Sequence, residues 1–258
     1  MIRIETDARG IAQLTLATPD RHNVLSAEMI GALDEAADRL GTDTAVRVVV
    51  LRAEGDSFCA GGDLGWMRAQ MAADARTRRA AAQALAGMLG KLNRLPKPLI
   101  GRIHGAAYGG GVGLACVCDV AIAAEGARFG LTETRLGLIP ATIGPYVVAR
   151  MGEAASRQVF YSGRRFGAEE AARLGIVARV VAPEDLDAAV EAEATPYLDC
   201  APGAVAAAKA LALRLGGAAG QEEIDASVEA LVAQWEGAEA PEGIAAFFER
   251  RKPSWAPE

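Results

Sequence analysis

Short apolar runs alternate with helical repeats along the first half of the chain. Residues 2–16 alternate apolar and polar positions on either side of a turn that contains Gly10, and this pattern predicts a β-hairpin. From Ser26, a candidate N-cap, apolar residues recur at helical spacing as far as Gly41. The β-branched run at 46–51 predicts a buried strand. This succession of strand, helix and strand favours an α/β fold with parallel strands.

Helical periodicity dominates the rest of the chain, where the apolar runs at 99–103 and 120–124 predict two further strands. The expected helices span 66–93, 146–161, 168–175, 202–215, 222–235 and 241–251. Because the last three follow one another without a strand between them, they are typical of a helical appendage or an oligomerisation module. We therefore divide the chain into a core at 1–195 and a helical oligomerisation region at 196–258.

A glycine-rich stretch at 101–119 separates one apolar run from another. Its triplet Gly109, Gly110 and Gly111 allows unusual φ angles before a helix that starts near Val112. Unpaired N–H groups at such a helix start suit an anion, either a resting phosphate or an oxyanion that develops during a reaction. The spacing is neither GxGxxG nor GxxxxGK[ST], so a dinucleotide fold or a P-loop is not expected. A tight strand-to-helix connection without a ligand is the alternative.

The overall charge narrows the choice of partner. The chain has 258 residues, 51% of them hydrophobic, and a net charge of −6. It is long enough for one or two domains with a sizeable core, and its acidic balance argues against nucleic acid or an anionic membrane as a partner. The basic cluster Arg76, Arg78 and Arg79 is interpreted as a solvated helix face, with phosphate contact as the alternative.

Localisation and metal content follow from simple patterns. The N-terminus lacks the features of a signal peptide, and no apolar run reaches the roughly 20 residues that span a bilayer, so we expect a cytoplasmic protein with no membrane partner. The four cysteines, Cys59, Cys116, Cys118 and Cys200, form no CxxC motif and are accompanied by two histidines. We expect no metal site, and reduced cysteines packed as small apolar residues.

Three motifs in order identify a family resemblance. They are FCAGGDL at 58–64, HGAAYGGGVGLACVCDVAIA at 104–123 and FGLTETRLGLIP at 129–140. Together they resemble the enoyl-CoA hydratase/isomerase (crotonase) family, and the resemblance continues to PEGIAAFFERRKPSW at 241–255. It implies a crotonase-like spiral of ββα units, followed by C-terminal helices that form a homotrimer or a hexamer built as a dimer of trimers. It also implies an acyl-CoA thioester substrate and no separate cofactor, since coenzyme A is part of the substrate.

The resemblance assigns chemistry to the glycines. In this family two backbone N–H groups stabilise a thioester enolate, and by position these belong to Gly62 and Gly110. Fixed donors of this kind bind the charge that develops in the transition state, and losing one typically costs about 3 kcal/mol. The acid/base residue is matched by Glu133, for which an exposed structural carboxylate is the alternative.

The substrate-binding residues come from the same matching. They are Arg21, Ala60, Asp63 and Leu64 along the coenzyme A path, and Phe247 and Arg250, which would reach the coenzyme A of a neighbouring subunit. Asp63 could instead only cap a helix, and Phe247 could instead only fill a helix interface.

The reaction depends on a departure from the family pattern. Hydratases of this family use two glutamates, and the first of them falls on Gly113 here. The segment LGLIPATIGPYVVARMGE at 136–153 is similar to hydratases that act on short branched or carboxylated enoyl-CoAs, including methylglutaconyl-CoA in leucine breakdown. A hydratase is therefore the first hypothesis, with Thr142, Tyr146 and Glu153 as candidates for placing water. A single-glutamate Δ3,Δ2-enoyl-CoA isomerase and a non-catalytic acyl-CoA-binding protein are the alternatives.

Overall fold

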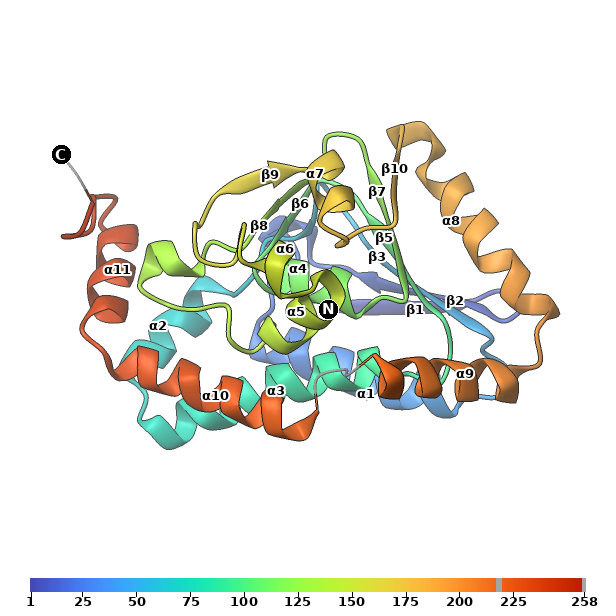
Figure 1. The fold of residues 1–258 in the computed structure, drawn as a ribbon, viewed down its shortest axis with the longest axis horizontal. Coiled ribbons are helices and arrows are strands. Elements are labelled where there is room, and N and C mark those ends of the chain that lie inside the picture. The colour runs from blue at the N-terminus through green and yellow to red at the C-terminus, as the bar shows by residue number, and fades with distance from the viewer. Residues whose placement is uncertain (217–219, 257–258) are drawn as a thin grey trace.

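The computed structural model describes residues 1–216 and 220–256, and these form two β-sheets covered by helices (Figure 1). The larger sheet has the order β1-β2-β3-β5-β7-β10. β1 runs antiparallel to β2, and every other pair of neighbours is parallel. Its strands are β1 (Ile2–Thr6), β2 (Ile11–Leu16), β3 (Val48–Ala53), β5 (Leu99–Ile103), β7 (Val120–Ala124) and β10 (Arg179–Val181).

The smaller sheet takes the continuation of three strands of the larger one. Its order is β4 (Ser57–Cys59), β6 (Ala106–Tyr108), β8 (Arg128–Gly130) and β9 (Arg165–Gly167), with β9 antiparallel to β8. A tight turn leads from β3 to β4, from β5 to β6 and from β7 to β8, and a helix follows each short strand. The chain is therefore a spiral of ββα units, as the family resemblance implies.

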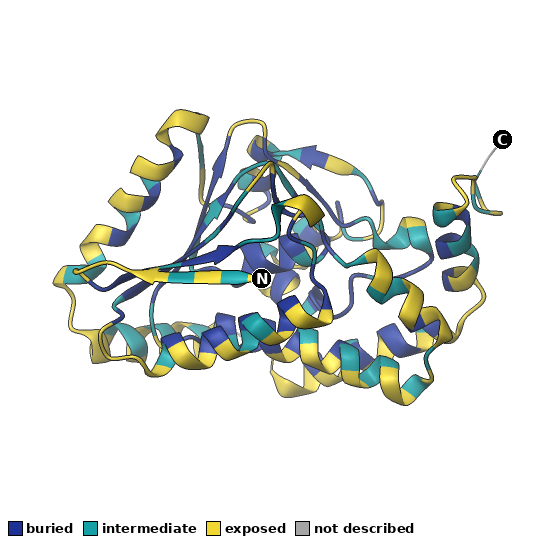
Figure 2. Ribbon diagram, turned by 180° about the vertical axis from the view of Figure 1, so that it is seen from behind, coloured by how far each residue is buried: buried dark blue, intermediate teal, exposed yellow. Residues whose placement is uncertain are grey.

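Helices cover both faces of the larger sheet. The helices are α1 (Ala27–Thr42), α2 (Leu64–Ala72), α3 (Ala75–Asn93), α4 (Gly110–Val117), α5 (Gly144–Met151), α6 (Glu153–Ser156), α7 (Ala168–Arg173), α8 (Leu186–Ala194), α9 (Pro202–Leu215), α10 (Gln221–Glu236) and α11 (Glu239–Phe248). Short 3₁₀ helices are η1 (Pro19–Arg21), η2 (Glu133–Leu136), η3 (Pro183–Asp185) and η4 (Thr195–Asp199). The main core lies between the sheet and α1, α3 and α4, and a smaller one lies under α8, so the interior strands are dark blue in Figure 2.

Most of the expected elements are present, with their predicted caps. The hairpin, the helix that follows Ser26 and the strands at 48–53 and 120–124 are confirmed. The Ser26 Oγ accepts a hydrogen bond from the Met29 N–H at 3.2 Å, as an N-cap side chain does. The short strands of the smaller sheet were not predicted, because three residues carry no readable period.

Two long helix predictions were wrong in the same way. The helix expected over 66–93 is interrupted at 73–74, where the Asp74 carboxylate accepts a hydrogen bond from the Thr77 N–H at 2.8 Å and starts α3. The helix expected over 146–161 is interrupted at Gly152, whose φ of 75° ends α5. Both interruptions are local, because a capping carboxylate or a left-handed glycine competes with apolar periodicity that continues past it.

The cysteines are free, as expected, but they do not share one environment. Cys59, Cys116 and Cys118 are buried, and burial raises the pKa of each thiol to about 12. Cys200 is exposed, so the expectation that it packs as an apolar residue was wrong. It lies in the turn between η4 and α9. In the part of the chain that the structure describes, no helix is long and apolar enough to cross a membrane.

The three C-terminal helices differ in how they contact the core. α10 packs along α3, and α11 packs on η2. Helix α9 has no buried residue, and it joins the core through the Lys209 ammonium, which lies 2.7 Å from an Asp119 carboxylate oxygen. An apolar cavity of about 570 Å³ lies between α9 and the α4–α5 region. The division of the chain at 195/196 stays a prediction, and residues 217–219 and 257–258 of its second part lie outside the described residues.

Candidate active site

Three neighbouring strands of the smaller sheet lead into the segments that carry the predicted site residues. β4, β6 and β8 are parallel and adjacent, so the segments that follow them leave from the same edge. Gly62 follows β4, Gly110 follows β6 and Glu133 follows β8. Ligands in α/β proteins bind at the carboxyl edge of parallel strands for this reason. The topology thus gathers three catalytic candidates that are more than 20 positions apart in sequence.

Helix α4 begins at this edge with backbone donors that have no acceptor within the helix. Gly109, the residue before it, has φ 48° and ψ −112°, a conformation that only glycine adopts readily. The Gly109 carbonyl accepts hydrogen bonds from the N–H groups of Val112 and Gly113, at 2.9 and 3.1 Å. The N–H groups of Gly110 and Gly111 precede these bonds and so have no acceptor within the helix. They point their partial positive charge out of the helix N-terminus.

The second backbone donor lies on the neighbouring segment. Leu25 donates its N–H to the Gly61 carbonyl at 2.8 Å, and its own carbonyl accepts from the Asp63 N–H at 3.4 Å. These two hydrogen bonds lie on either side of Gly62 and do not involve the Gly62 N–H. The two segments are packed backbone to backbone, since a Cβ added to Gly61 would lie 3.0 Å from the Tyr108 carbonyl oxygen and one added to Gly111 would lie 2.3 Å from the Cys59 carbonyl oxygen. Glycine is therefore required on both sides.

The Glu133 carboxyl group is buried beside these glycines. A Cβ added to Gly109 would lie 2.8 Å from the Glu133 Oε1. Although the residue as a whole is partly exposed, its Oε2 is out of contact with solvent and has no hydrogen-bond partner among the described residues. Burial raises the pKa of Glu133 from 4.5 to about 7. The alternative of an exposed structural carboxylate does not fit this environment, because the buried oxygen makes no structural contact.

The C-terminal helices hold the segment that carries Glu133. Gly243 of α11 lies against η2, where an added Cβ would be 2.5 Å from the Leu136 carbonyl carbon. The Gln234 side chain of α10 donates to the Gly137 carbonyl at 2.7 Å. Gly137 ends η2 in the left-handed conformation, with φ 70°. No sequence pattern indicated that residues about 100 positions away support the segment that carries Glu133.

Apolar side chains fill the space next to Gly113. A Cβ at Gly113 would lie 2.6 Å from the Ile143 Cγ2 and 3.6 Å from the Leu89 Cδ1. A larger side chain has no room there unless Ile143 moves. At the position where two-glutamate hydratases carry a glutamate, packed apolar side chains therefore leave no room for that side chain.

The three candidates for placing water are in different environments. The Tyr146 hydroxyl donates to the Ala86 carbonyl at 2.8 Å, so it is committed to α3. The Glu153 side chain is 78% exposed and pairs with Arg157. Thr142 is buried, directly before the Ile143 that packs on Gly113, and among the described residues its hydroxyl has no hydrogen bond. Of the three, Thr142 alone combines burial with an uncommitted polar group.

The predicted coenzyme A residues of the first half lie together. Arg21 Nη2 is 2.5 Å from an Asp63 oxygen, and the Ala60 N–H donates to the His22 carbonyl at 3.0 Å. Asp63 also caps α2, because its other oxygen accepts from the Trp66 N–H at 2.9 Å. Partial burial acts to raise the pKa of Asp63, but the hydrogen bonds from the Trp66 N–H and Arg21 lower it below its ordinary value. Leu64 begins α2 and is 46% exposed.

Phe247 and Arg250 lie at the end of α11. Phe247 is half exposed and makes an edge-to-face contact with Phe248, whose ring lies under the Arg68 guanidinium. Arg250 is exposed and follows α11 with φ 55°. Both side chains therefore face outward, and the contact of Phe247 with Phe248 leaves half of it uncovered, so it does not only fill an interface within this chain.

Three contributors to the site were missed from the sequence. Leu25 flanks Gly62 and its Cδ1 would lie 2.5 Å from a Cβ on Gly110, Ile143 closes the space beside Gly113, and Gln234 supports η2. Neither leucine nor isoleucine carries a chemical signature, and Gln234 acts through a backbone carbonyl. Only the glycine spacing could have indicated such close packing. Among the described residues no group of three or more His, Cys, Asp or Glu side chains is placed to hold a metal ion.

The arrangement combines a titrating carboxyl group with fixed donors. A pKa near 7 suits a group that both takes and returns a proton near neutral pH. Backbone N–H groups at the start of α4 suit an oxygen that gains charge during the reaction. The site is therefore built for proton transfer next to a polarised carbonyl.

Comparison with known proteins gives the same assignment. The family model for enoyl-CoA hydratase/isomerase matches residues 6–258. The chain is 31% identical over 252 residues to the crotonyl-CoA hydratase of Syntrophomonas wolfei, covering 94% of this chain and 93% of that protein. An enoyl-CoA hydratase from Mycobacterium avium superposes with a TM-score of 0.88 at 29% identity, over 99% of this chain and 98% of that one. AtuE of Pseudomonas aeruginosa does so at 0.81 and 38%, over 99% of each chain. The chain belongs to the enoyl-CoA hydratase/isomerase family.

Proposed function

We propose that this protein adds water to a short or branched 2-enoyl-CoA, with Glu133 as the acid/base residue. The observation that carries the proposal is the buried Glu133 carboxyl group, which has a raised pKa and an unpartnered oxygen beside the first residues of α4. The N–H groups of Gly62 and Gly110 receive the thioester oxygen. The substrate class is supported by the crotonyl-CoA hydratase relative and by the similarity of 136–153 to hydratases of the methylglutaconyl-CoA type.

One carboxylate is sufficient for the proton balance. Ionised Glu133 takes a proton from water while the water oxygen forms a bond to the β-carbon. The electron pair of the double bond moves toward the thioester, and its oxygen gains charge against the two N–H groups. The Glu133 carboxyl group then returns the proton to the α-carbon, so that one water has been added and Glu133 is ionised again. Thr142 is the candidate for orienting the water.

The remaining residues hold the coenzyme A part. Arg21, next to Asp63, faces the phosphates, and Ala60 and Leu64 line the path on either side of Gly62. Phe247 and Arg250 face outward and so are placed to reach a second subunit. Exposed apolar side chains on α9, Leu211 and Leu215, support a homotrimer or a hexamer as the working form in the cytoplasm.

A second function, Δ3,Δ2-enoyl-CoA isomerisation, is favoured by the closed space beside Gly113. Isomerisation moves one proton between two carbons and needs no second carboxylate. Glu133 would take the proton from the α-carbon and return it to the γ-carbon, with the same two N–H groups holding the intermediate enolate.

A paired substrate assay separates the two reactions. Crotonyl-CoA and 3-hexenoyl-CoA are incubated separately, and the absorbance of the conjugated thioester is followed. Hydration removes this absorbance from crotonyl-CoA, whereas isomerisation creates it from 3-hexenoyl-CoA. We expect the first signal to dominate in the wild type, to fall by about 10²-fold or more in Glu133→Gln, and to persist in Glu153→Gln, a matched change of an exposed carboxylate. Saturable crotonyl-CoA binding without turnover, unchanged in Glu133→Gln, would establish instead a non-catalytic acyl-CoA-binding protein.

A further inference from the structure

A polar groove lies on the face of the larger sheet that α8 covers, away from Glu133. Its cavity of about 630 Å³ is lined by strands β1, β2, β3 and β5 and by the start of α8. A smaller cavity of about 190 Å³ continues it beneath α8 and shares Gln13, Arg52 and Arg102 with it. None of the residues assigned to acyl-CoA binding lines either cavity.

Three arginines form a row across the floor of this groove. Arg3 is paired with Thr15 in the register of β1 and β2, and Thr15 with Arg52 in that of β2 and β3. Because Leu51 is paired with Gly101, Arg102 follows beside Arg52 on the next strand. Neighbouring strands are about 4.8 Å apart, so the charges of Arg52 and Arg102 repel each other, whereas Thr15 on β2 separates Arg52 from Arg3.

The two outer arginines form ion pairs, and among the described residues the central one meets only the longer-range charge of Asp187, which is already paired with Arg102. Arg3 pairs with Glu54, and Arg102 pairs with Asp187 at 2.6 Å. In residues 1–216 and 220–256 the Arg52 guanidinium has no hydrogen bond or ion pair. An unpaired guanidinium between two others, in a cavity, is a position where an anion is stabilised by charge-assisted hydrogen bonds.

The histidine in the groove does not supply the missing partner. His104 Nε2 is 2.7 Å from the Gly55 carbonyl, to which it donates, and its Nδ1 accepts from Arg102 Nη1 at 3.3 Å. This arrangement requires the neutral ring, and partial burial lowers the pKa of His104. The ring therefore orients Arg102 without contributing charge.

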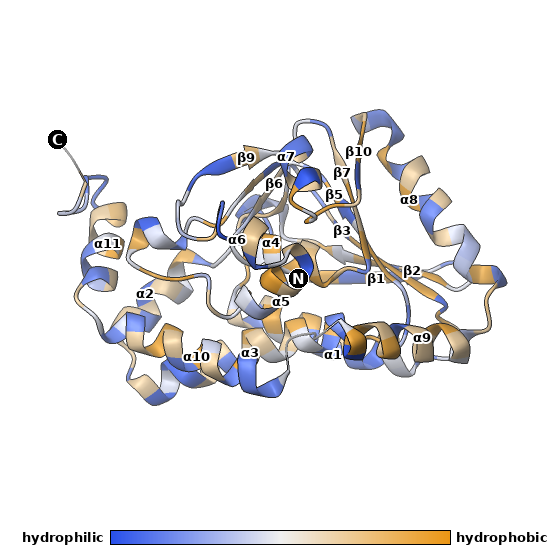
Figure 3. Cartoon of the chain, in the orientation of Figure 1, coloured by the Kyte–Doolittle hydropathy of each residue, from blue (hydrophilic) through white to orange (hydrophobic). Residues whose placement is uncertain are grey.

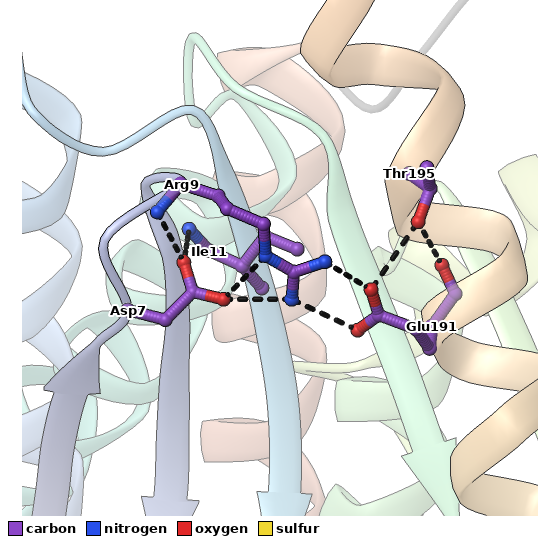
Figure 4. Close-up of polar contacts among 5 residues, drawn as sticks. All are labelled: Asp7, Arg9, Ile11, Glu191 and Thr195. Atoms are coloured by element: carbon purple, nitrogen blue, oxygen red, sulfur yellow. Dashed lines mark hydrogen bonds and ion pairs between the residues drawn. The ribbon is translucent and has the colours of Figure 1, made fainter.

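Glu191, an acidic residue that lines the smaller cavity, already has an ion-pair partner. Glu191 of α8 pairs with Arg9, whose guanidinium also binds Asp7, and Glu191 accepts from the Thr195 hydroxyl at 3.3 Å (Figure 4). The same contacts fix α8 to the β1–β2 turn. The groove is thus preformed, and Glu191 is not free to neutralise Arg52.

Acceptors without partners lie one row along the sheet from the arginines, where Gln13 lines both cavities together with Arg52 and Arg102. The Gln13 Oε1 is buried and has no hydrogen-bond partner in the described residues. Its cross-strand neighbour Glu5 lines the same cavity and has no ion pair within that part of the chain. Glu5 is two positions from Arg3 along β1, and Gln13 is two positions from Thr15 along β2. Each separation corresponds to about 7 Å along the strand. This part of the groove therefore suits a hydrogen-bond donor.

We infer that this groove binds a small organic anion that carries an amine group. Its carboxylate or phosphate would lie against Arg52 and Arg102, with the Thr15 hydroxyl beside it. Its amine would lie near Gln13 and Glu5. Such a ligand neutralises the central arginine and satisfies the buried amide oxygen in one binding event. The site is separate from the acyl-CoA site and does not rest on the proposed reaction.

The two histidines of the chain give a position-specific test. Ring signals of His104 and His22 are followed by ¹H–¹⁵N NMR of the full chain, with calorimetry in parallel. The probes are phosphoethanolamine and 4-aminobutyrate, with inorganic phosphate and butyrate as anions that lack the amine. We expect the amine-bearing probes to shift His104 and leave His22 in place, and Arg52→Gln to weaken binding by about tenfold or more. Arg21→Gln is the matched control and should leave this binding unchanged.

Three results would overturn the inference. The first is no shift of His104 with any of the four probes up to about 10 mM, which is weaker than useful ligand affinity. The second is binding that survives Arg52→Gln or moves His22 instead, which would place the anion at the coenzyme A site. The third is equal affinity for butyrate and 4-aminobutyrate, which would remove the amine requirement. A well-dispersed NMR spectrum of Arg52→Gln shows that any loss of binding is not a loss of fold.

Discussion

Gly109 and Glu133 are packed so closely that the first residue cannot carry a side chain while the second keeps its position. A Cβ on Gly109 would be 2.8 Å from the Glu133 Oε1, and the φ of Gly109 is 48°. One glycine therefore sets both the direction of the first N–H groups of α4 and the place of the Glu133 carboxyl group.

Replacing Gly109 by alanine should remove activity more than it removes stability. The substitution moves the Glu133 carboxyl group and strains the backbone, and such strain costs on the order of 1–3 kcal/mol. We expect crotonyl-CoA turnover to fall by about 10²-fold or more, as for loss of an oxyanion donor. Steady-state kinetics and urea unfolding measure the two effects. Turnover close to that of the wild type would show that Glu133 does not act from the position described.

Glu133→Gln should stabilise the protein at neutral and alkaline pH. The folded pKa of about 7 lies above the unfolded value of 4.5, so the folded state holds the proton more tightly. Below about pH 4.5 both states are protonated and the substitution has little effect. Between pH 4.5 and 7 the wild type loses stability as pH rises, and above pH 7 the full penalty of about 3 kcal/mol is present.

Urea unfolding of Glu133→Gln and the wild type at pH 4 and pH 8 checks this. The difference in unfolding free energy should be small at pH 4 and favour the variant at pH 8. The same difference at both pH values would mean that the Glu133 carboxyl group is not buried in the folded state.

Gly113 and Ile143 should show strong energetic coupling. Gly113→Ala places a methyl group 2.6 Å from the Ile143 Cγ2 and should destabilise the protein by about 1–3 kcal/mol. Ile143→Ala alone should cost about 2–5 kcal/mol through the cavity that it leaves. The double variant should be more stable than the sum of the single changes predicts, because the added methyl partly fills that cavity.

Gly87→Ala is the control for the Gly113 substitution. Gly87 is also inside a helix, and a Cβ there meets nothing within 4 Å, so alanine should stabilise by up to about 1 kcal/mol. Additive free energies for Gly113→Ala and Ile143→Ala would show that the two residues are not in contact.

The exposed leucines of α9 should control assembly. Leu211 and Leu215 are 55% and 77% exposed on a helix that has no buried residue, and Figure 3 shows this helix as largely hydrophobic. Contiguous apolar surface of this kind marks a protein interface. We expect Leu211→Glu with Leu215→Glu to convert a trimer or hexamer to monomer in sedimentation velocity. Tyr161→Glu, an equally exposed site elsewhere, should leave assembly intact. A wild-type monomer would contradict the prediction.

The sequence motifs at 58–64, 104–123 and 129–140 were informative, because the local backbone conformation requires their glycines and capping residues. Gly62 and Gly110 were predicted as donors, and the structure places both at the edge formed by β4, β6 and β8. Ser26 and Asp63 were predicted as caps and do accept hydrogen bonds from N–H groups of the next turn. These features depend on a few adjacent residues, so the sequence carries them directly.

The larger helices were predicted less well at their ends. Apolar periodicity continues through Gly152 and through 73–74, and only the local backbone ends the helices there. The strands of the smaller sheet are three residues long, and their pairing joins segments more than 20 positions apart. Such pairing is a property of the fold and leaves no period in the sequence.

The α/β class and the family follow from the sequence alone, and so do the positions of the two glycines that we propose as donors and of the single glutamate. Their surroundings follow only from the folded chain. Burial raises the pKa of Glu133, and Ile143 closes the space beside Gly113. Helices α10 and α11 hold η2, the 3₁₀ helix that begins with Glu133. Strand register placed Arg52 between two other arginines. Burial, packing and register depend on residues distant in sequence, and for this reason only the folded chain brings them together.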